Sequence, residues 1–309
     1  MNNRATRLFF LLALAIICFP LSYAAGEDNN IPDGVLLNQL FEDMQEFSVS
    51  YLRPDQIISR LNKASVAYIP LGPLEWHGRH MPMGADPMNA QTVALACCRI
   101  TGGIVWPALY FGAATLRSPE QAAKIFGPEV DTWVHSVDFP GNSLPSAFSS
   151  PDMLALITRE SVRQVAAMGA KVIILMSGHA AGSHMKALND IAIEINAEAD
   201  GPVVSVMGSW PSPPLHPEKE GHATALETSI IMAQTRSVDL EQLPPLNQPL
   251  KYTESGIADD WSGSGNTGFT VSPEADPRTA ASAAVGAAEH ENAVNEITGK
   301  IKELLGSLH

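Results

Sequence analysis

Residues 66–86 read VAYIPLGPLEWHGRHMPMGAD, an apolar run followed at once by a cluster of carboxylate and imidazole side chains. The run from Val66 to Leu71 predicts a buried β-strand, because it is short, apolar and bounded by turn-forming residues. If the chain stays extended beyond the strand, Glu75 and His77 lie on the same side, since side chains alternate with a period of two. The glycines and proline that follow turn the chain, and Asp86 then comes back toward both side chains.

Together, Glu75, His77 and Asp86 form a set of metal-ligand residues. Carboxylate oxygens combined with imidazole nitrogen suit Zn, Mn or Fe. The alternative is a polar surface loop with solvated histidines, and we favour the metal site because so many ligand-type residues rarely collect beside a buried strand. His80, in the same stretch, is either a contact near the metal or substrate, or a structural histidine of the turn.

Apolar runs and helical periodicities alternate along the rest of the chain. They predict helices over 36–47, from 54, 87–100, 151–168, 185–199 and 222–235, and strands over 66–71, 104–109, 172–176 and 203–207. Such alternation predicts an α/β fold with a doubly wound, mostly parallel sheet covered by helices on both faces. Residues 110–150, rich in Gly, Pro and Ser, are expected to form a functional loop region or a lid.

Further ligand-type residues follow the later strands of this predicted sheet. His179 comes directly after the strand 172–176, and His222 and Glu227 bracket the start of a later helix. Active sites of doubly wound sheets lie outside the carboxyl ends of the strands, so these side chains should meet the first cluster there. Three carboxylates plus a bridging hydroxide balance two divalent cations, which favours a dinuclear hydrolytic site with Asp86 as the bridge.

Five motifs, taken in order, resemble the creatininase (creatinine amidohydrolase) family. They are LGPLEWHGRHMPMGAD (71–86), FPG (139–141), SGHAAG (177–182), HATALETS (222–229) and, more weakly, ADPRTA (275–280). The resemblance runs from about residue 50 to the C-terminus. It implies a three-layer α/β/α sandwich that is often assembled as a hexamer, and therefore a homo-oligomer here.

The resemblance also implies roles for individual residues. His222 would be the proton shuttle beside the scissile amide, and Glu227 would join it as a catalytic residue. His80, Gly178 and Asn142 would contact the substrate. Two divalent ions per chain, Zn and/or Mn with Fe as an alternative, would be held by Glu75, His77, Asp86, His179 and Glu227.

Departures from the family pattern bear on the substrate. Ala181 stands where the creatinine-hydrolysing members carry a glutamate at the metal centre, Asn142 replaces the usual threonine of the FPGT motif, and Thr224 replaces a glycine. We therefore expect metal-bound hydroxide to cleave a C–N amide bond in a small molecule, either a cyclic amide or a formamide, but not in creatinine. The alternative is a non-catalytic exported protein that binds a small molecule on the same fold.

The N-terminal segment predicts export. Residues 1–24 combine Arg4 and Arg7 with an apolar stretch and the small residues of a cleavage site, which is the pattern of a signal peptide. Residues 25–309 would then be a single periplasmic or secreted domain. The signal holds two arginines and no acid, so its loss takes the net charge from −14 to −16. Such a charge argues against nucleic acid or an anionic membrane surface as a partner.

The remaining cysteines and histidines receive structural interpretations. Cys97 and Cys98 are adjacent on a predicted helix and are expected to be buried free thiols, because adjacent helical positions point about 100° apart. Three histidines are expected to be solvated, namely His135, His184 and His216. A fourth, His290, is expected at the surface of a C-terminal helix.

Overall fold

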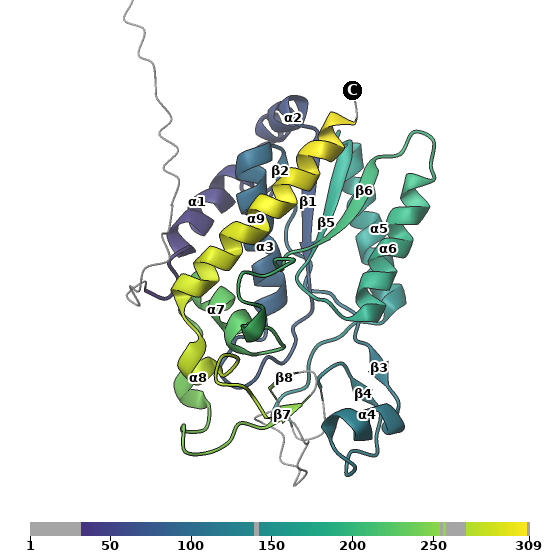
Figure 1. The fold of residues 1–309 in the computed structure, drawn as a ribbon. Helices are drawn as coiled ribbons and strands as arrows, with labels where there is room; N and C mark the ends of the chain where they lie inside the picture. The colour runs from purple at the N-terminus through teal and green to yellow at the C-terminus, as the bar shows by residue number, and fades with distance from the viewer. Residues whose placement is uncertain (1–31, 139–141, 254–255, 258–269, 308–309) are drawn as a thin grey trace, which may run out of the picture.

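The computed structural model describes residues 32–138, 142–253, 256–257 and 270–307 (Figure 1). The predicted signal peptide and the FPG motif lie outside these ranges. Within them, none of the helices combines the length and the apolarity that crossing a membrane requires.

A parallel sheet forms the centre of the described structure. Its four strands there lie in the order β2-β1-β5-β6, with bounds β1 (Val66–Leu71), β2 (Ile104–Val105), β5 (Val172–Ser177) and β6 (Val203–Gly208). β1 pairs with β5 so that Leu71 lies opposite Ser177, which brings the ends of these two strands together. Successive strands are added on opposite sides of β1, and this confirms the predicted doubly wound α/β fold.

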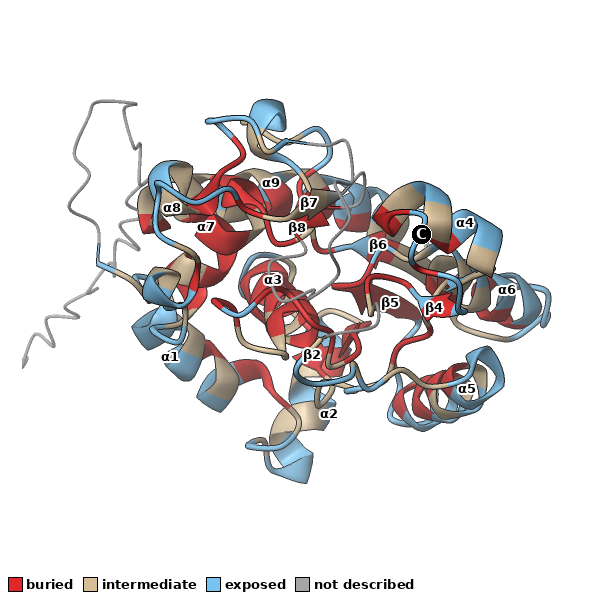
Figure 2. Cartoon of the chain, turned by 90° about the horizontal axis from the view of Figure 1, so that it is seen from below, coloured by how far each residue is buried: buried red, intermediate tan, exposed pale blue. Residues whose placement is uncertain are grey.

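Side-chain alternation along β1 creates two cores, one on each face of the sheet. Val66 and Tyr68 pack into a cluster with α1 (Leu37–Phe47), α3 (Ala85–Thr101) and α9 (Ala283–Gly306). Ala67 and Ile69 pack into a second cluster with α2 (Pro54–Lys63), α5 (Pro151–Ala167) and α6 (Gly182–Asn196). Figure 2 shows buried residues gathered on the sheet and on α3, and along parts of α5 and α9. The result is the expected α/β/α sandwich.

The remaining elements lie beyond the carboxyl end of the sheet or beside it. They are β3 (Leu116–Arg117), α4 (Pro119–Phe126), β4 (Val134–His135), α7 (Ala225–Gln234), β7 (Tyr252–Thr253), β8 (Gly256–Ile257), α8 (Pro277–Ala280) and the short 3₁₀ turns Pro217–Lys219 and Leu240–Gln242. The segment predicted as a loop therefore contains a helix and a strand pair. Helix α4 begins with a capping box formed by Ser118 and Gln121, with proline at its first position.

Several predicted boundaries are shifted, and the shift of α3 affects a ligand. Helix α7 starts at Ala225 instead of residue 222, and α6 ends at Asn196 instead of residue 199. Strand β2 covers only two residues of the predicted run 104–109, and α6 starts at Gly182 instead of residue 185. Helix α3 starts at Ala85, two residues earlier than predicted, so Asp86 lies in its first turn. A carboxylate there interacts favourably with the partial positive charge at the helix N-terminus.

Predictions for the histidines outside the first cluster are only partly correct. His135 is exposed as expected, but His184, which lies in the first turn of α6, is completely buried. His216 is half-buried, with Nδ1 2.8 Å from Oε1 of the buried Glu289. His290 is half-buried too, and burial lowers its pKa to about 4. The sequence pattern missed these placements because the partners lie on elements distant in sequence.

The two cysteines behave as predicted. Cys97 and Cys98 are both buried and free on α3. Burial raises the pKa of the Cys97 thiol to about 12, so it is protonated at neutral pH and has no nucleophilic character.

Candidate metal centre

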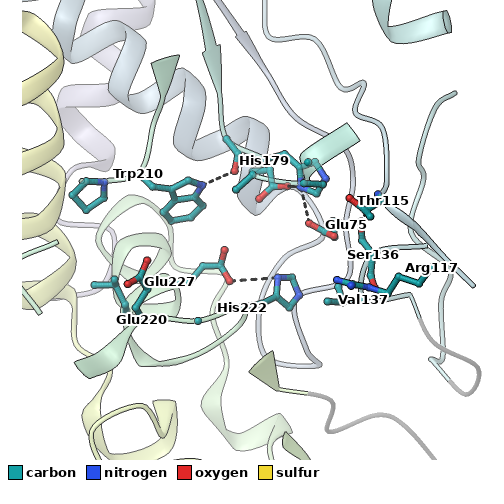
Figure 3. Close-up of a pocket in the computed structure, with 18 residues that line it drawn as sticks. Glu75, Thr115, Arg117, Ser136, Val137, His179, Trp210, Glu220, His222 and Glu227 are labelled. Atoms are coloured by element: carbon teal, nitrogen blue, oxygen red, sulfur yellow. Dashed lines mark hydrogen bonds and ion pairs between the residues drawn. The ribbon is translucent and has the colours of Figure 1, made fainter. Parts of the chain in front are cut away.

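Ligand-type side chains from four segments meet beyond the ends of β1 and β5 (Figure 3). Glu75 and His77 lie in the loop that follows β1, which leaves the sheet at Leu71 yet still directs both side chains to the same site. Asp86 projects from the first turn of α3, and His179 lies two residues beyond β5. Glu227 lies in the first turn of α7.

Asp86 occupies the middle of this group. Its Oδ1 lies 3.2 Å from His77 Nε2, and its Oδ2 lies 3.0 Å from His179 Nδ1. Glu75 Oε2 is 3.0 Å from His179 Nδ1, while Glu227 Oε1 is 3.5 Å from His77 Nε2. Three groups of donors lie close enough to hold a cation, and two of them share Asp86, namely Glu75–Asp86–His179 and His77–Asp86–Glu227. The third, Glu75–His77–His222, lacks Asp86.

The spacing of these atoms fits two cations. Ligands about 2.1 Å from a common cation lie roughly 3.0–3.4 Å from one another, and most of the observed distances fall in that range. His77 Nδ1 lies 3.0 Å from the carbonyl oxygen of Glu75, which places the ring proton on Nδ1 and leaves the lone pair of Nε2 facing the acids. His77 Nε2 and Asp86 Oδ2 are buried without a hydrogen-bond partner, as expected of atoms that bind a metal.

The charges of the cluster shift the pKa values of its members. Burial would lower the pKa of His179, but Glu75 and Asp86 outweigh it and raise that pKa to about 10. For His77, burial is likewise outweighed by Glu227 and Asp86, and its pKa lies well above the ordinary value. Burial would raise the pKa of Asp86, yet His77 and His179 hold it below the usual range. Metal ions would replace these protons as the positive charges of the site.

His222 lies beside the two ligand sets. Its ring centroid is 4.5 Å from that of His77, and its Nε2 lies 2.7 Å from the carbonyl oxygen of Trp76. The carbonyl can only accept, so Nε2 carries the proton and Nδ1 faces Glu227 Oε2 at 3.8 Å. Glu227 Oε2 also accepts the backbone N–H of Ala223 at 2.5 Å, which a left-handed φ of 57° at Ala223 makes possible.

A cavity of about 440 Å³ opens over these groups. Its wall includes Glu75, Asp86, His179, His222, Glu227 and also Gly178, proposed from the sequence as a substrate contact. It also contains residues that the sequence had not singled out: Thr115, Arg117, Ser136, Val137, Pro211, Glu220 and Leu226. Several of them belong to the segment 110–150 that was expected to be functional, but no motif identified them individually.

Two predicted substrate contacts lie away from this wall. His80 is buried, with Nε2 2.9 Å from Thr228 Oγ1, and burial followed by the charge of His77 lowers its pKa to about 4. Asn142 donates from Nδ2 to Asp138 Oδ1 at 3.2 Å. Neither residue belongs to the described cavity wall.

A family model described as creatinine amidohydrolase matches residues 50–301, most of the chain. The chain belongs to the creatininase family. A sequence comparison with curated proteins finds no significant match.

Solved creatininases share the fold. The chain is 22% identical to a creatinine amidohydrolase (creatininase), with a TM-score of 0.60 over 84% of this chain and 98% of that chain. An Mn creatininase gives 22% identity and a TM-score of 0.60 over 84% and 99%. A putative creatinine amidohydrolase from Bacteroides fragilis NCTC 9343 gives 18% identity and a TM-score of 0.58 over 84% and 97%. Other solved creatininases include a mutant of Zn-Zn type and a mutant complexed with creatine.

Gly178 is expected to tolerate no side chain in this member of the creatininase family. A Cβ at position 178 would lie 1.9 Å from the carbonyl oxygen of Asp86, so the first turn of α3 would have to move. Overpacking of this kind costs roughly 1–3 kcal/mol or more. Gly178→Ala should therefore lower both stability and metal content, measured by denaturant unfolding and elemental analysis.

A second glycine of the same loop provides the control. A Cβ at Gly182 would meet nothing closer than Thr115 Oγ1 at 4.0 Å, so Gly182→Ala should bind metal normally. Normal metal content in Gly178→Ala would show that α3 adjusts without cost to Asp86.

Proposed function

We propose that this chain is an exported, metal-dependent amidohydrolase that cleaves a C–N amide bond in a small molecule. The observation that carries the proposal is the pair of ligand sets joined by Asp86 at the floor of a cavity, with His222 beside them. Family membership supports hydrolysis as the reaction class. Glu75, Asp86 and His179 would hold one divalent cation, and His77, Asp86 and Glu227 the other, with Zn and Mn as the proposed metals.

Two divalent cations in these positions would supply an activated water near neutral pH and electrostatic stabilisation for the oxygen of the amide. The protein supplies orientation and proton transfer. Glu75 O fixes the tautomer of His77, and the Ala223 N–H fixes Glu227 with Oε1 directed at His77 Nε2. Backbone groups thus hold the His77 and Glu227 side chains in place.

His222 is the proposed proton carrier. Trp76 O fixes the proton on Nε2, so Nδ1 is the atom that can accept a proton and pass it to the leaving nitrogen. Nδ1 faces Glu227 Oε2, a carboxylate that would stabilise the doubly protonated ring during transfer. His222 also lines the cavity, where a substrate amide would reach it.

Size and chemistry of the cavity suggest the substrate class. A volume of about 440 Å³ lies within the range of small-molecule sites. Trp210 lines it, with Nε1 donating to Gly178 O at 2.7 Å, and offers an apolar ring surface. Ala181 places a methyl group on the wall where creatinine-hydrolysing relatives carry an acid. We therefore propose a cyclic amide or a formamide other than creatinine.

A metal-loaded preparation of residues 25–309 tests the function. Elemental analysis should find two Mn or Zn ions per chain, and a panel of cyclic amides and formamides should contain a compound that is hydrolysed. His222→Gln is the matched variant, because it should keep the metals and lose at least about a hundredfold in turnover. Two bound metals with ligand binding but no hydrolysis would instead favour the non-catalytic binding protein.

Export is proposed from the N-terminal pattern of residues 1–24, and a homo-oligomer, a hexamer, from the family resemblance. N-terminal sequencing of the protein isolated from its native host should begin at Ala25, within about two residues, because signal peptidases cut after a small residue. Soluble protein that still begins at Met1 would contradict export.

A further inference from the structure

His184 is a completely buried histidine that lies beside the proposed metal ligand His179. It lies in the first turn of α6, and its ring meets the ring of His179 edge-on, with centroids 5.1 Å apart and planes at 80°. His179 Nδ1 in turn faces Glu75 and Asp86. His184 is thus adjacent to the metal centre but is not part of the cavity wall.

The hydrogen bonds of His184 have fixed directions. The Ala113 backbone N–H lies 3.3 Å from Nδ1 and can only donate, so Nδ1 accepts and the ring proton sits on Nε2. Nε2 then donates to Ser177 Oγ at 2.9 Å. Ser177 Oγ accepts the His179 N–H at 3.2 Å and donates its own proton to the His179 carbonyl oxygen at 2.7 Å.

This chain of bonds fully occupies the Ser177 hydroxyl. A hydroxyl has one proton and two acceptor positions, and here all three are used. Both backbone polar groups of His179 are therefore held by one oxygen, and that oxygen is oriented by His184. Without the hydrogen bond from His184 Nε2, the Ser177 hydroxyl could rotate and lose one of its two hydrogen bonds to the His179 backbone.

His184 also joins the ligand loop to the segment 113–115, which lines part of the cavity. Ala113 precedes Thr115, which lines the cavity, and the neighbouring Ser183 Oγ donates to the carbonyl oxygen of Ala114 at 2.6 Å. The start of α6 thereby ties the loop carrying His179 to the wall carrying Thr115.

We propose that His184 is a positioning residue of the metal centre, which fixes His179 through Ser177 so that Nδ1 is directed at the cation shared with Glu75 and Asp86. The proposal rests on the proposed metal-dependent function. Residues that orient a metal ligand typically contribute 10- to 100-fold to metal affinity. The simpler alternative is a buried histidine that only fills space and satisfies Ala113.

Two amide substitutions separate these roles. In His184→Gln the terminal nitrogen can take the place of Nε2 and donate to Ser177, whereas the bond from Ala113 is lost. In His184→Asn the side-chain oxygen can take the place of Nδ1 and accept from Ala113, whereas the bond to Ser177 is lost. Ser177→Ala removes the link with little change in volume, and so tests it independently of how α6 packs.

Calorimetric titration of the metal-free proteins with Mn²⁺ is the test. His184→Asn and Ser177→Ala should each weaken one of the two Mn²⁺ affinities by about 10- to 100-fold and leave the other within about threefold. His184→Gln should stay close to the unsubstituted protein. Thermal unfolding of each metal-free variant reports the structural cost separately.

Several outcomes would overturn the role. Equal affinity losses in His184→Gln and His184→Asn, or losses that only follow the fall in thermal stability, would make His184 a packing residue. Unchanged affinities in Ser177→Ala would do the same. If the unsubstituted protein binds two Mn²⁺ ions, these outcomes overturn only the role of His184 and leave the proposed metal-dependent function standing. If it binds none, the proposed metal-dependent function fails, and the role of His184 fails with it.

Discussion

Asp86→Ala is expected to empty both cation positions of the metal centre. Oδ1 lies 3.2 Å from His77 Nε2 and Oδ2 lies 3.0 Å from His179 Nδ1, so one substitution removes a carboxylate oxygen from both ligand sets. It also removes the negative charge between two cations, whose repulsion grows in a buried site of low dielectric constant. Elemental analysis after loading with Mn or Zn should find almost no metal, and Mn²⁺ titration should show both affinities at least about a hundredfold weaker.

His77→Ala is the comparison for Asp86→Ala. Of the two sets that share Asp86, it disrupts only the one containing Glu227, because Glu75, Asp86 and His179 retain their donors. It should therefore cost mainly one cation. Asp86→Asn, which keeps the side-chain shape, separates the loss of charge from the loss of packing. Equal metal loss in His77→Ala and Asp86→Ala would count against Asp86 as the bridge.

The second large effect is expected for Glu227→Gln. Oε1 of Glu227 lies 3.5 Å from His77 Nε2. In the set His77–Asp86–Glu227, Glu227 supplies the second carboxylate beside that of Asp86. Ala181 supplies no acid to the site, which makes the charge of Glu227 more important. The amide keeps the size of the side chain and can still accept the Ala223 N–H, but it removes the negative charge. We expect one cation per chain in place of two, and hydrolysis reduced at least about a hundredfold.

Glu220→Gln is the matched control for Glu227→Gln. Glu220 lines the same cavity but belongs to neither ligand set within the described structure. The Glu220→Gln variant should therefore bind both cations. The measurement is metal content together with turnover of whichever substrate the panel identifies. Full occupancy and near-normal turnover in Glu227→Gln would show that the residue serves only to hold the Ala223 backbone.

Much of the fold could be predicted because it depends on local pattern. The fully apolar runs of β1 and β5 indicated strands covered on both faces, and the structure places them side by side at the centre of the sheet. Helix α5 starts at Pro151, as predicted, with Ser150 accepting the Met153 N–H as its N-cap. The same kind of signal at Ser118 marks α4, yet the richness of its surroundings in Gly, Pro and Ser led to the prediction of a loop.

Histidine environments show where local pattern failed. From the sequence, His184 and His216 are expected to be solvated. In the structure, His184 bonds to Ser177 and Ala113, and His216 bonds to Glu289 from α9. None of these bonds could be predicted from periodicity, since periodicity reports only the burial of a face and not its polar partners.

The sequence alone determined the α/β class, the family and the meeting of the ligand residues at the carboxyl edge of the sheet. It could do so because the pattern and direction of the strands place the loops that carry these residues. Only the tertiary structure decided how those side chains divide into two sets around Asp86. It also decided that His222 faces the site through Nδ1, since the carbonyl oxygen that orients it belongs to Trp76, 146 residues away in the chain. Such details depend on packing between segments distant in sequence, and a shift of a few tenths of an ångström there changes which atoms can share a cation.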